Sequence, residues 1–333
     1  MKYERAVEIL REHYGLSDCE VSHIEGGVTN TTYLVTSSDG TQYIVQKLNQ
    51  IFTNETVIDY QKLSKDLIAQ GWDLQQLIPT IDGRVCVADQ QEIWRLLTYI
   101  PADPVSDHTS VDLMHGAGSL LARLHRSLAM SAHVPVYTIP HCHDTPYLLH
   151  TLDELSEQLV GESHELAEQV LSAYRTLDPL PSAPKQLIHG DPRTTNILFR
   201  NGKPYTYIDF DMVMIGTVWV DIGDLLRAAC GDTTQTHAQY NSEYIDAIID
   251  GYATAAGLTG SPDLFHSIAM NAMRTIALEL AARFLIDIVY DDHFGWDGSL
   301  FVSRSEHNLA RAQAQCQIYV HSMLHEDLTP VLP

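Results

Sequence analysis

The chain has 333 residues, of which 43 are acidic and 20 basic, so its formal net charge is −23. This balance argues against a protein that binds nucleic acid or an anionic membrane, because neutralising phosphates requires clustered Lys and Arg. No apolar run reaches the roughly 20 residues that a membrane-spanning helix needs. Five scattered cysteines without a paired spacing predict a reduced, cytoplasmic compartment, and the oligomeric state stays open.

Residues 1–100 predict a small β-rich lobe. An amphipathic helix begins the chain, and the strands CEVSHIEGG and TTYLVTSSDGTQYIVQKLN follow, the latter interrupted by a hairpin turn at Asp39-Gly40. We expect a helix from about Thr53 to Gln70, and then the strands RVCVA and EIWRLLTYI. This half therefore reads as one sheet that carries a helix.

Residues 101–333 predict a larger, mostly helical lobe, entered through the proline-containing linker Pro101-Ala102-Asp103-Pro104. Leucines and alanines at helical spacing predict a helix over about 111–130, and further helices are expected at 151–177, 221–230, 238–256, 262–290 and 305–325. Residues 186–210 are the exception and predict a strand pair. The fold class is thus α+β with two lobes, and such an arrangement favours a ligand site between them.

The most informative segment reads HGDPRTTN at 189–196, followed by YIDFD at 207–211. It presents Asp191, then Asn196 five positions later, and then Asp209, 18 positions after Asp191. These are short side chains whose oxygen atoms suit a hard cation or a substrate hydroxyl. If the intervening hairpin folds back, the three side chains meet at one place.

This set matches the needs of phosphoryl transfer from a magnesium nucleotide. Asp191 would orient the attacking hydroxyl, and Asn196 and Asp209 would hold Mg²⁺. Asp211 either supplements the metal site or is a hydrogen-bonded residue at a strand end. The spacing H-x-D-x-x-x-x-N equals that of the protein-kinase catalytic loop, with Gly190 in place of its arginine. The competing interpretation is a turn rich in Asp and Asn for conformational reasons alone.

The same chemistry asks for a phosphate-binding cation in the first lobe, and Lys47 in YIVQKLN is the candidate. The alternative is a solvated surface lysine. An acidic partner from the following helix would hold Lys47, and the candidates are Glu55, Asp59 and Asp66.

Further nucleotide contacts are expected at EGGVTN and near the end of the last strand. Gly26 and Gly27 would let the backbone approach phosphates, with Thr29 and Asn30 beside them, although a Gly-Gly turn is also an ordinary hairpin. We also place Leu97 and Tyr99 in the nucleotide site.

Other polar residues have structural interpretations. His189 and Asp221 are expected to support the loop, Asp221 by capping a helix and accepting bonds from the loop backbone. His125, on a leucine-rich helix face, predicts a hydrogen-bonded core histidine. The run His141-Cys142-His143 resembles a soft-metal site only superficially, because no second ligand cluster accompanies it, and a surface or loop role is favoured.

Three motifs carry a family resemblance, namely HGDPRTTN, YIDFD and VDIGD. They stand in the order and at the distances that fit the aminoglycoside phosphotransferase and choline kinase superfamily, and the sequence resembles this superfamily. The resemblance implies a protein-kinase-like bilobal fold, ATP and Mg²⁺ as cofactors, and a small-molecule acceptor. The stretches GGVTNTTYLV, YIVQKLNQIFTN and RFLIDIVYDDHFGWDGS are similar to the branch that contains N-acetylhexosamine 1-kinase.

The leading hypothesis is therefore a kinase for a hydroxyl of a small polar metabolite, with an N-acetylhexosamine or related sugar first in line. Arg193, Asp211, Arg283, Asp287 and Trp296 are the candidates for contacts with the acceptor. An amino-alcohol or aminoglycoside kinase is the second hypothesis, because acidic groups of the large lobe would attract a cationic acceptor. A non-catalytic nucleotide-binding module, a pseudokinase, is the alternative from a different class.

Overall fold

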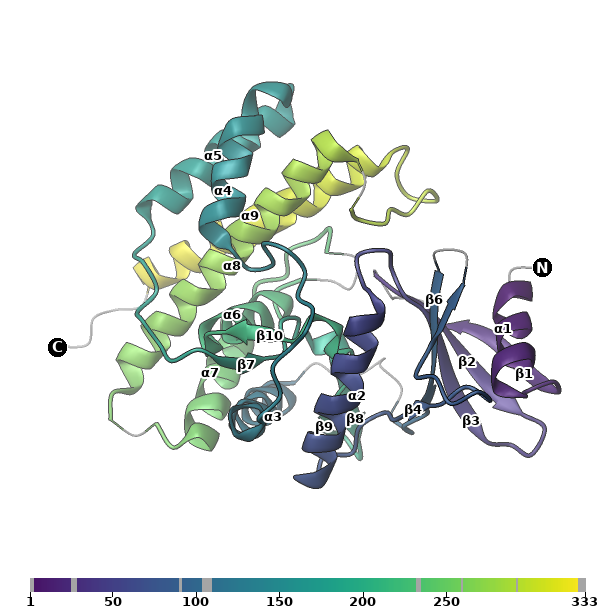
Figure 1. Ribbon diagram of the computed structural model, residues 1–333. Helices are drawn as coiled ribbons and strands as arrows, with labels where there is room; N and C mark the ends of the chain where they lie inside the picture. Colours follow the sequence, from purple (N-terminus) through teal and green to yellow (C-terminus); the bar gives the residue numbers. More distant parts are fainter. Residues whose placement is uncertain are drawn as a thin grey trace.

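The computed structural model describes residues 3–24, 29–89, 92–103, 110–231, 235–258, 260–291 and 293–328. Figure 1 shows two lobes, a sheet with its helices at the N-terminal end and a larger group of helices at the C-terminal end, with helix α2 between them. Among the described residues, no helix combines the length and apolar character that a membrane crossing requires.

The N-lobe sheet follows the predicted order of elements. The elements of the N-lobe are α1 (Glu4–Tyr14), β1 (Cys19–Ile24), β2 (Thr31–Ser37), β3 (Gln42–Lys47), α2 (Asn54–Ala69), β4 (Leu77–Ile78), β5 (Val87–Asp89) and β6 (Glu92–Thr98). The strands pair in the order β1-β2-β3-β6-β4, with β5 also on β6, and every pairing is antiparallel. Gly40 has φ +85°, as the predicted hairpin turn requires.

The two faces of this sheet have different neighbours. On the outer face, Val45, Trp94 and Leu96 pack with α1 in one apolar cluster. On the inner face, Ile44 and Leu97 pack in a second cluster with α2 and with helices of the C-lobe. Because successive residues of a strand alternate between faces, the register decides which polar side chains point toward the C-lobe.

The C-lobe helices also lie close to their predicted positions. They are α3 (Val111–Met130), α4 (Thr145–Leu155), α5 (Glu162–Thr176), α6 (Val218–Ala228), α7 (Ser242–Ala256), α8 (Pro262–Tyr290) and α9 (Arg304–Leu328). The single helix expected over 151–177 is two helices, because Gly161 adopts φ +56° between them. Asp144 caps the first of the two, accepting from the Tyr147 N–H, so that helix begins earlier than expected.

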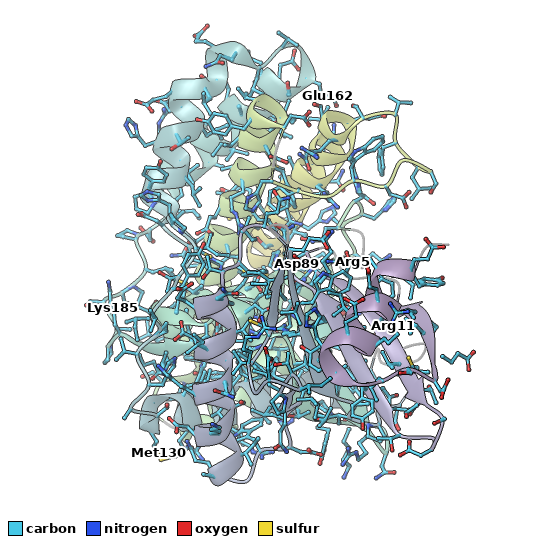
Figure 2. The ribbon with its side chains drawn as sticks, turned by 45° about the vertical axis from the view of Figure 1, so that its right-hand side comes forward. Arg5, Arg11, Asp89, Met130, Glu162 and Lys185 are labelled. Carbon is cyan, nitrogen blue, oxygen red and sulfur yellow. The ribbon has the colours of Figure 1, made fainter. Side chains whose placement is uncertain are left out.

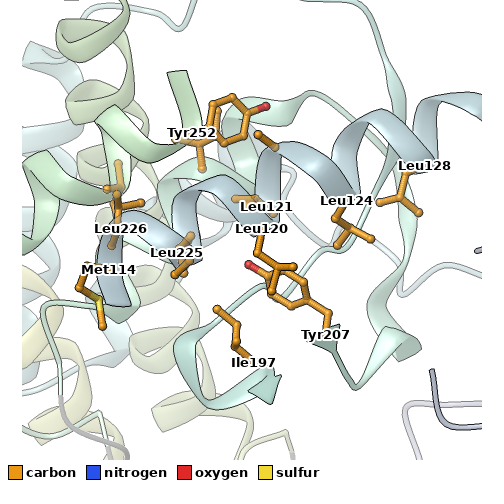
Figure 3. Packing of buried hydrophobic residues seen from close by; sticks show 14 of the residues in the cluster. Met114, Leu120, Leu121, Leu124, Leu128, Ile197, Tyr207, Leu225, Leu226 and Tyr252 are labelled. Carbon is orange, nitrogen blue, oxygen red and sulfur yellow. The ribbon is translucent and has the colours of Figure 1, made fainter. Parts of the chain in front are cut away.

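Helix α3 lies at the centre of the C-lobe core. Figure 3 shows its Leu120, Leu121 and Leu124 among side chains from α6, α7 and the β8–β9 hairpin, and all three leucines are buried. A Cβ atom on Gly118 would lie 2.0 Å from the Ile248 carbonyl oxygen. Helices α3 and α7 are therefore in direct backbone contact, which only glycine permits.

Two short strand pairs lie among these helices. β7 (Gln186–Ile188) pairs with β10 (Met214–Gly216), and β8 (Ile197–Arg200) pairs with β9 (Lys203–Tyr207). The loop that follows β7 and the segment that precedes β10 consequently start from neighbouring strands. This pairing brings residues 189–196 close to residues 208–212.

Candidate active site

The loop after β7 is held from behind by Asp221 of α6. The backbone bonds predicted for Asp221 are present, since Oδ2 accepts from the His189 N–H (2.7 Å) and Oδ1 from the Gly190 N–H (2.9 Å). His125, a buried core histidine as expected, donates from Nε2 to the same carboxylate at 2.9 Å. Gly190 has φ +81°, and a Cβ there would lie 2.3 Å from the Met212 carbonyl oxygen, so glycine is required.

His189 connects this loop to the segment that carries Asp209. Burial lowers the pKa of His189, so its ring is neutral at pH 7. A neutral ring offers one donor and one acceptor. Here Nε2 donates to the Ile208 carbonyl (3.1 Å), and Nδ1 accepts from the Asp191 N–H (3.3 Å).

Asp191 is oriented by two neighbours in its own loop. The Asn196 Nδ2 group donates to the Asp191 carbonyl oxygen (2.9 Å) and to its Oδ2 (3.2 Å). The Arg193 Nε lies 2.7 Å from Oδ1 of the same carboxylate. An Asn whose amide nitrogen is engaged in this way presents Oδ1 as its cation-binding atom.

Asp209 stands at the start of the 3₁₀ turn η4 (Phe210–Met212) in a left-handed conformation, with φ 64° and ψ 61°. Burial, together with the carboxylates of Asp211 and Asp191, raises the pKa of Asp209 to about 7, although Arg95 and Arg193 oppose the shift. A buried carboxylate that is repelled by two neighbouring carboxylates is stabilised in its ionised form by a nearby cation.

The donor set of Asn196 and Asp209 suits Mg²⁺. Over the described ranges, no group of three or more His, Cys, Asp or Glu side chains gathers as a metal site. Mg²⁺ does not need such a cage, because it retains waters and uses one or two carboxylates together with substrate phosphates. The predicted pair of oxygen ligands is thus chemically adequate.

Asp211, predicted to bind metal or acceptor, is committed elsewhere. It is 7% exposed, and its Oδ1 accepts from the Arg95 NH1 group at 2.5 Å. Its Oδ2 accepts from the Arg95 NH2 group (2.8 Å) and from the Asn30 Nδ2 group (2.8 Å). The structure therefore supports the hydrogen-bonded role for Asp211 and not the metal or acceptor role.

Lys47 lies on the outer face of the sheet, away from this site. Its Nζ is 2.5 Å from Oε1 of Glu92, and Oε2 of the same carboxylate lies 3.7 Å from the Arg5 Nε group of α1. Arg5 also pairs with Asp89, and Figure 2 labels both residues beside α1. The phosphate-binding role predicted for Lys47 is not supported, because the strand position that faces inward is Gln46.

None of the three acidic partners suggested for Lys47 contacts it. Asp59 accepts from the N–H groups of Val136 and Tyr137, and Asp66 accepts from Ser131. Glu55 is exposed in the first turn of α2. The partner of Lys47 is Glu92 on the adjacent strand.

The other predicted nucleotide contacts have mixed placements. Gly26 and Gly27 lie outside the described residues. Thr29 lines a cavity described below, and Asn30 is buried against Asp211. Leu97 is buried at the end of β6 with Tyr99 following, both at the inner-face core, where their nucleotide role stays a prediction.

His143 lies in the turn before α4, in agreement with the predicted loop role, but sequence reasoning missed that its ring is buried at the site. Its ring is buried, with Nδ1 2.9 Å from Oε1 of Glu279 and Nε2 donating to the Gly190 carbonyl at 2.8 Å. Burial alone would lower the pKa of His143, but the charge of Glu279 and its hydrogen bond raise it to about 10. A charged imidazole thus supports the Gly190 carbonyl of the loop after β7, the loop that Asp221 also holds.

A cavity with an empty volume of about 760 Å³, counted with its open mouth, adjoins Asp191. Its charged lining pairs off: Asp191 with Arg193, Asp224 with Arg227, and Glu279 with His143. Arg283 is the remaining charged side chain among the described lining residues. The full lining comprises Thr29, Asn49, Ile51, Ile139, His143, Gly190, Asp191, Arg193, Met212, Asp224, Arg227, Gln235, Ile276, Glu279, Leu280, Arg283, Phe284, His293 and Phe294.

Comparison with known proteins agrees with this geometry. Residues 20–259 match the model of the phosphotransferase enzyme family. The chain belongs to this family. A homoserine kinase of Polaromonas naphthalenivorans (strain CJ2) is 26% identical over 294 residues, which cover 83% of each chain.

Two solved structures share the phosphotransferase fold. A microcompartment-associated aminopropanol kinase superposes with a TM-score of 0.65 at 17% identity, covering 97% of this chain and 98% of the other. An amicoumacin kinase superposes with a TM-score of 0.61 at 15% identity, covering 94% and 90%. The superfamily resemblance and the bilobal fold are confirmed, and the chain is a phosphotransferase for hydroxyl acceptors. The N-acetylhexosamine branch stays a prediction.

The acceptor residues predicted for this phosphotransferase lie at different distances from the cavity. Arg193 and Arg283 line it, and the Arg283 guanidinium carbon is 5.6 Å from the Phe294 ring centroid. Asp287 is buried and accepts from the N–H groups of His293 (2.8 Å) and Phe294 (3.0 Å), so it holds the cavity wall and does not line it. Trp296 is 42% exposed and outside the lining, which argues against sugar stacking there.

The raised pKa of Asp209 predicts a pH dependence of the phosphotransferase's stability. Between the ordinary pKa of 3.8 and the folded value of about 7, the unfolded chain loses this proton while the folded chain keeps it. Rising pH therefore favours unfolding across this interval, and the penalty is constant above it. Denaturant titrations from pH 4 to pH 8 should show wild type losing stability relative to Asp209→Asn. A difference that does not vary with pH would refute the shift.

Proposed function

We propose that the chain is an ATP- and Mg²⁺-dependent kinase that transfers the γ-phosphoryl group to a hydroxyl of a small polar metabolite, with an N-acetylhexosamine or related sugar as the first candidate. The observation that carries the proposal is the placement of Asp191. Its carboxylate is fixed by Asn196 and Arg193 and opens on the cavity of about 760 Å³. Asp209 is contributed by the adjoining segment between β9 and β10.

In this mechanism the acceptor occupies the cavity and donates a hydrogen bond from its hydroxyl to Asp191. The carboxylate aligns the oxygen for attack and takes its proton as the phosphoryl group transfers, while Arg193 keeps the carboxylate in place. Asn196 and Asp209 would hold Mg²⁺, which neutralises phosphate charge. A nucleotide and a divalent cation occupy the similar amicoumacin kinase, solved with AMP-PNP and Ca²⁺, and this supports the same cofactor class here.

Charge at the cavity bears on the acceptor. The four cations Arg193, Arg227, Arg283 and protonated His143 face three carboxylates, each of which already has a cationic partner. A polycationic aminoglycoside would meet repulsion from Arg283, whereas a neutral sugar would not. The amino-alcohol and aminoglycoside hypothesis therefore has less support than the sugar hypothesis.

Homoserine is a second candidate acceptor. It is favoured by the similarity to the Polaromonas homoserine kinase over most of both chains. The carboxylate of homoserine would pair with the Arg283 guanidinium, and its hydroxyl would reach Asp191. A pseudokinase has no support in the site, because Asp191, Asn196 and Asp209 are all present.

A panel of acceptors separates these candidates. Purified protein with ATP and Mg²⁺ is assayed for ADP release with hexosamines, simple sugars, homoserine, choline, ethanolamine and aminoglycosides. We expect the highest kcat/KM with a hexosamine or with homoserine, and a sugar KM that changes little with salt. An aminoglycoside preferred at low salt, with a KM that rises steeply at high salt, would favour the second hypothesis. ATP binding without turnover of any acceptor would overturn the proposed function.

A further inference from the structure

The basic side chain on the inner face of the N-lobe sheet is an arginine of β6. The six described strands of this sheet contain one Lys, Lys47, and one Arg, Arg95, and these two residues lie on opposite faces. Gln46 and Arg95 are cross-strand partners in the β3–β6 register, so both side chains point toward the C-lobe.

Arg95 is almost completely enclosed, at 2% exposure, and its three donor groups are all engaged. The Nε group donates to Gln46 Oε1 at 2.9 Å, while NH1 and NH2 make the parallel bonds to Asp211 described above. The guanidinium carbon lies 5.3 Å from the ring centroid of Tyr60 on α2. This planar, two-pronged geometry is specific to arginine, because a lysine ammonium cannot reproduce it.

The ion pair joins the two lobes. Arg95 belongs to the sheet, whereas Asp211 belongs to the C-lobe segment between β9 and β10. A second N-lobe contact ends on the same carboxylate, because Asn30 donates to Asp211 and accepts from the Asn49 N–H at 3.0 Å. Strand β6, the segment before β2 and the loop after β3 are therefore tied to one turn of the C-lobe.

That turn is the one that sets Asp209. Asp211 lies two residues further along, inside the 3₁₀ turn that begins where Asp209 adopts its left-handed conformation. A residue other than glycine stays in that region only where its surroundings fix it. Phe210 of this turn is buried in the core, and the next residue, Asp211, is held by Arg95.

We propose that Arg95 is a positioning residue for the phosphoryl-transfer site: by holding Asp211 it fixes the turn that carries Asp209 and couples the N-lobe to the metal-binding segment. The inference rests on the proposed function for the role of Asp209. It assigns Arg95 the place in the N-lobe that the sequence had suggested for Lys47, although Arg95 acts through Asp211 and does not itself contact the phosphates.

The test measures binding of a non-hydrolysable ATP analogue by calorimetry over a Mg²⁺ titration, so it does not depend on turnover. Arg95→Lys keeps the charge but loses the parallel bonds. Arg95→Met/Asp211→Leu removes both charges and leaves neither buried alone, which a fold tolerates better than a single unpaired charge. Lys47→Met is the matched control on the outer face. Thermal unfolding confirms that each variant is folded.

We expect Arg95→Lys and the double variant to need at least about tenfold more Mg²⁺ for half-saturation, the factor for losing one charge-assisted hydrogen bond. In turnover assays kcat should fall and the acceptor KM should change little. Lys47→Met should stay within about twofold of wild type, since exposed ion pairs contribute little.

Two results would overturn the inference. The first is a folded Arg95 variant, Arg95→Lys or the double variant, that retains the wild-type Mg²⁺ dependence, because the ion pair would then be merely structural. The second is a Lys47→Met protein whose nucleotide binding is weakened as much as that of the Arg95 variants. Failure of the proposed function is distinguishable, because there wild type would phosphorylate no acceptor while the Mg²⁺ dependence still separated the variants.

Discussion

Asp191→Ala should lower kcat by about 10²–10⁴-fold, the range that general-base assistance contributes. The variant removes the carboxylate that faces the cavity but leaves Asn196 and Asp209, so Mg²⁺-dependent nucleotide binding should persist. Arg193, released from its ion pair 2.7 Å from Asp191, still lies in the cavity and does not replace a proton acceptor. Steady-state kinetics with the best acceptor and calorimetry with an ATP analogue measure the two effects separately.

Asp191→Asn is the matched variant for this experiment. It keeps the size of the side chain and its ability to bond Asn196, but it removes the charge, so it should be nearly as inactive as the alanine variant. Glu168→Ala, an exposed position on α5, is the control for removing a carboxylate far from the site. An Asp191→Ala enzyme that retains kcat within about twofold of wild type would show that another group accepts the proton.

Asp221→Ala should be the most destabilising of the site variants, with a loss of about 3–5 kcal/mol in the free energy of unfolding. Burial alone would raise the pKa of Asp221, but the hydrogen bonds from His125 and from the Gly190 N–H lower it, so the carboxylate is ionised at neutral pH. Alanine would leave the buried N–H groups of His189 and Gly190 without their acceptor. Denaturant unfolding measures the loss.

Tyr252→Phe provides a graded control for Asp221→Ala. It removes the hydroxyl that lies 2.8 Å from His125 Nδ1 while leaving the Asp221 contacts with the loop backbone. The expected loss is about 1 kcal/mol, the usual contribution of one neutral hydrogen bond. If both variants lost the same free energy, Asp221 would not be the main support of the loop.

The arrangement of the loop at 189–196 could be predicted from the sequence because its contacts are local, and its catalytic role stays a proposal. Asp191, Asn196 and Asp209 lie within 19 consecutive residues, and their spacing alone suggested that they meet. The bonds from Asp221 to the loop backbone were also predicted, but its predicted capping role was wrong, because Thr217 is the N-cap of α6 and Asp221 lies inside the first turn. These interactions depend on short-range geometry, which motif spacing encodes.

The cation of the first lobe could not be predicted in the same way. A shift of one residue in strand register moves a side chain to the opposite face, so Gln46 and Lys47 exchange roles without any change in composition. Arg95 and its partner Asp211 are 116 positions apart, and no local pattern links them. Only the paired register of β3 and β6 shows which residue points inward.

His143 illustrates the same limit in the second lobe. Its partner Glu279 lies 136 positions away, in the middle of α8. Periodicity placed α8 correctly but gave no reason for a buried glutamate to require a charged histidine. The ion pair, and with it the support of the Gly190 carbonyl, arises from tertiary packing.

The net charge of −23 suggested an attraction for cationic acceptors, and the cavity argues otherwise. Arg193, Arg227 and Arg283 are three of only 20 Lys and Arg residues in the chain, and all three line one cavity. This local concentration opposes the overall charge of the chain. Long-range charge therefore says little about the acceptor, and the arginines at the cavity are the basis for proposing a neutral or anionic molecule.

Phosphorus NMR of wild-type protein with ATP, Mg²⁺ and the best acceptor tests the central claim most directly. The account predicts that the γ-phosphate signal is replaced by that of a phosphomonoester on the acceptor, in equal amount to the ADP formed. The Asp191→Ala variant should leave the ATP signals unchanged on the same time scale. Conversion of ATP to inorganic phosphate at one rate with or without acceptor, or no change with any acceptor class, would contradict it.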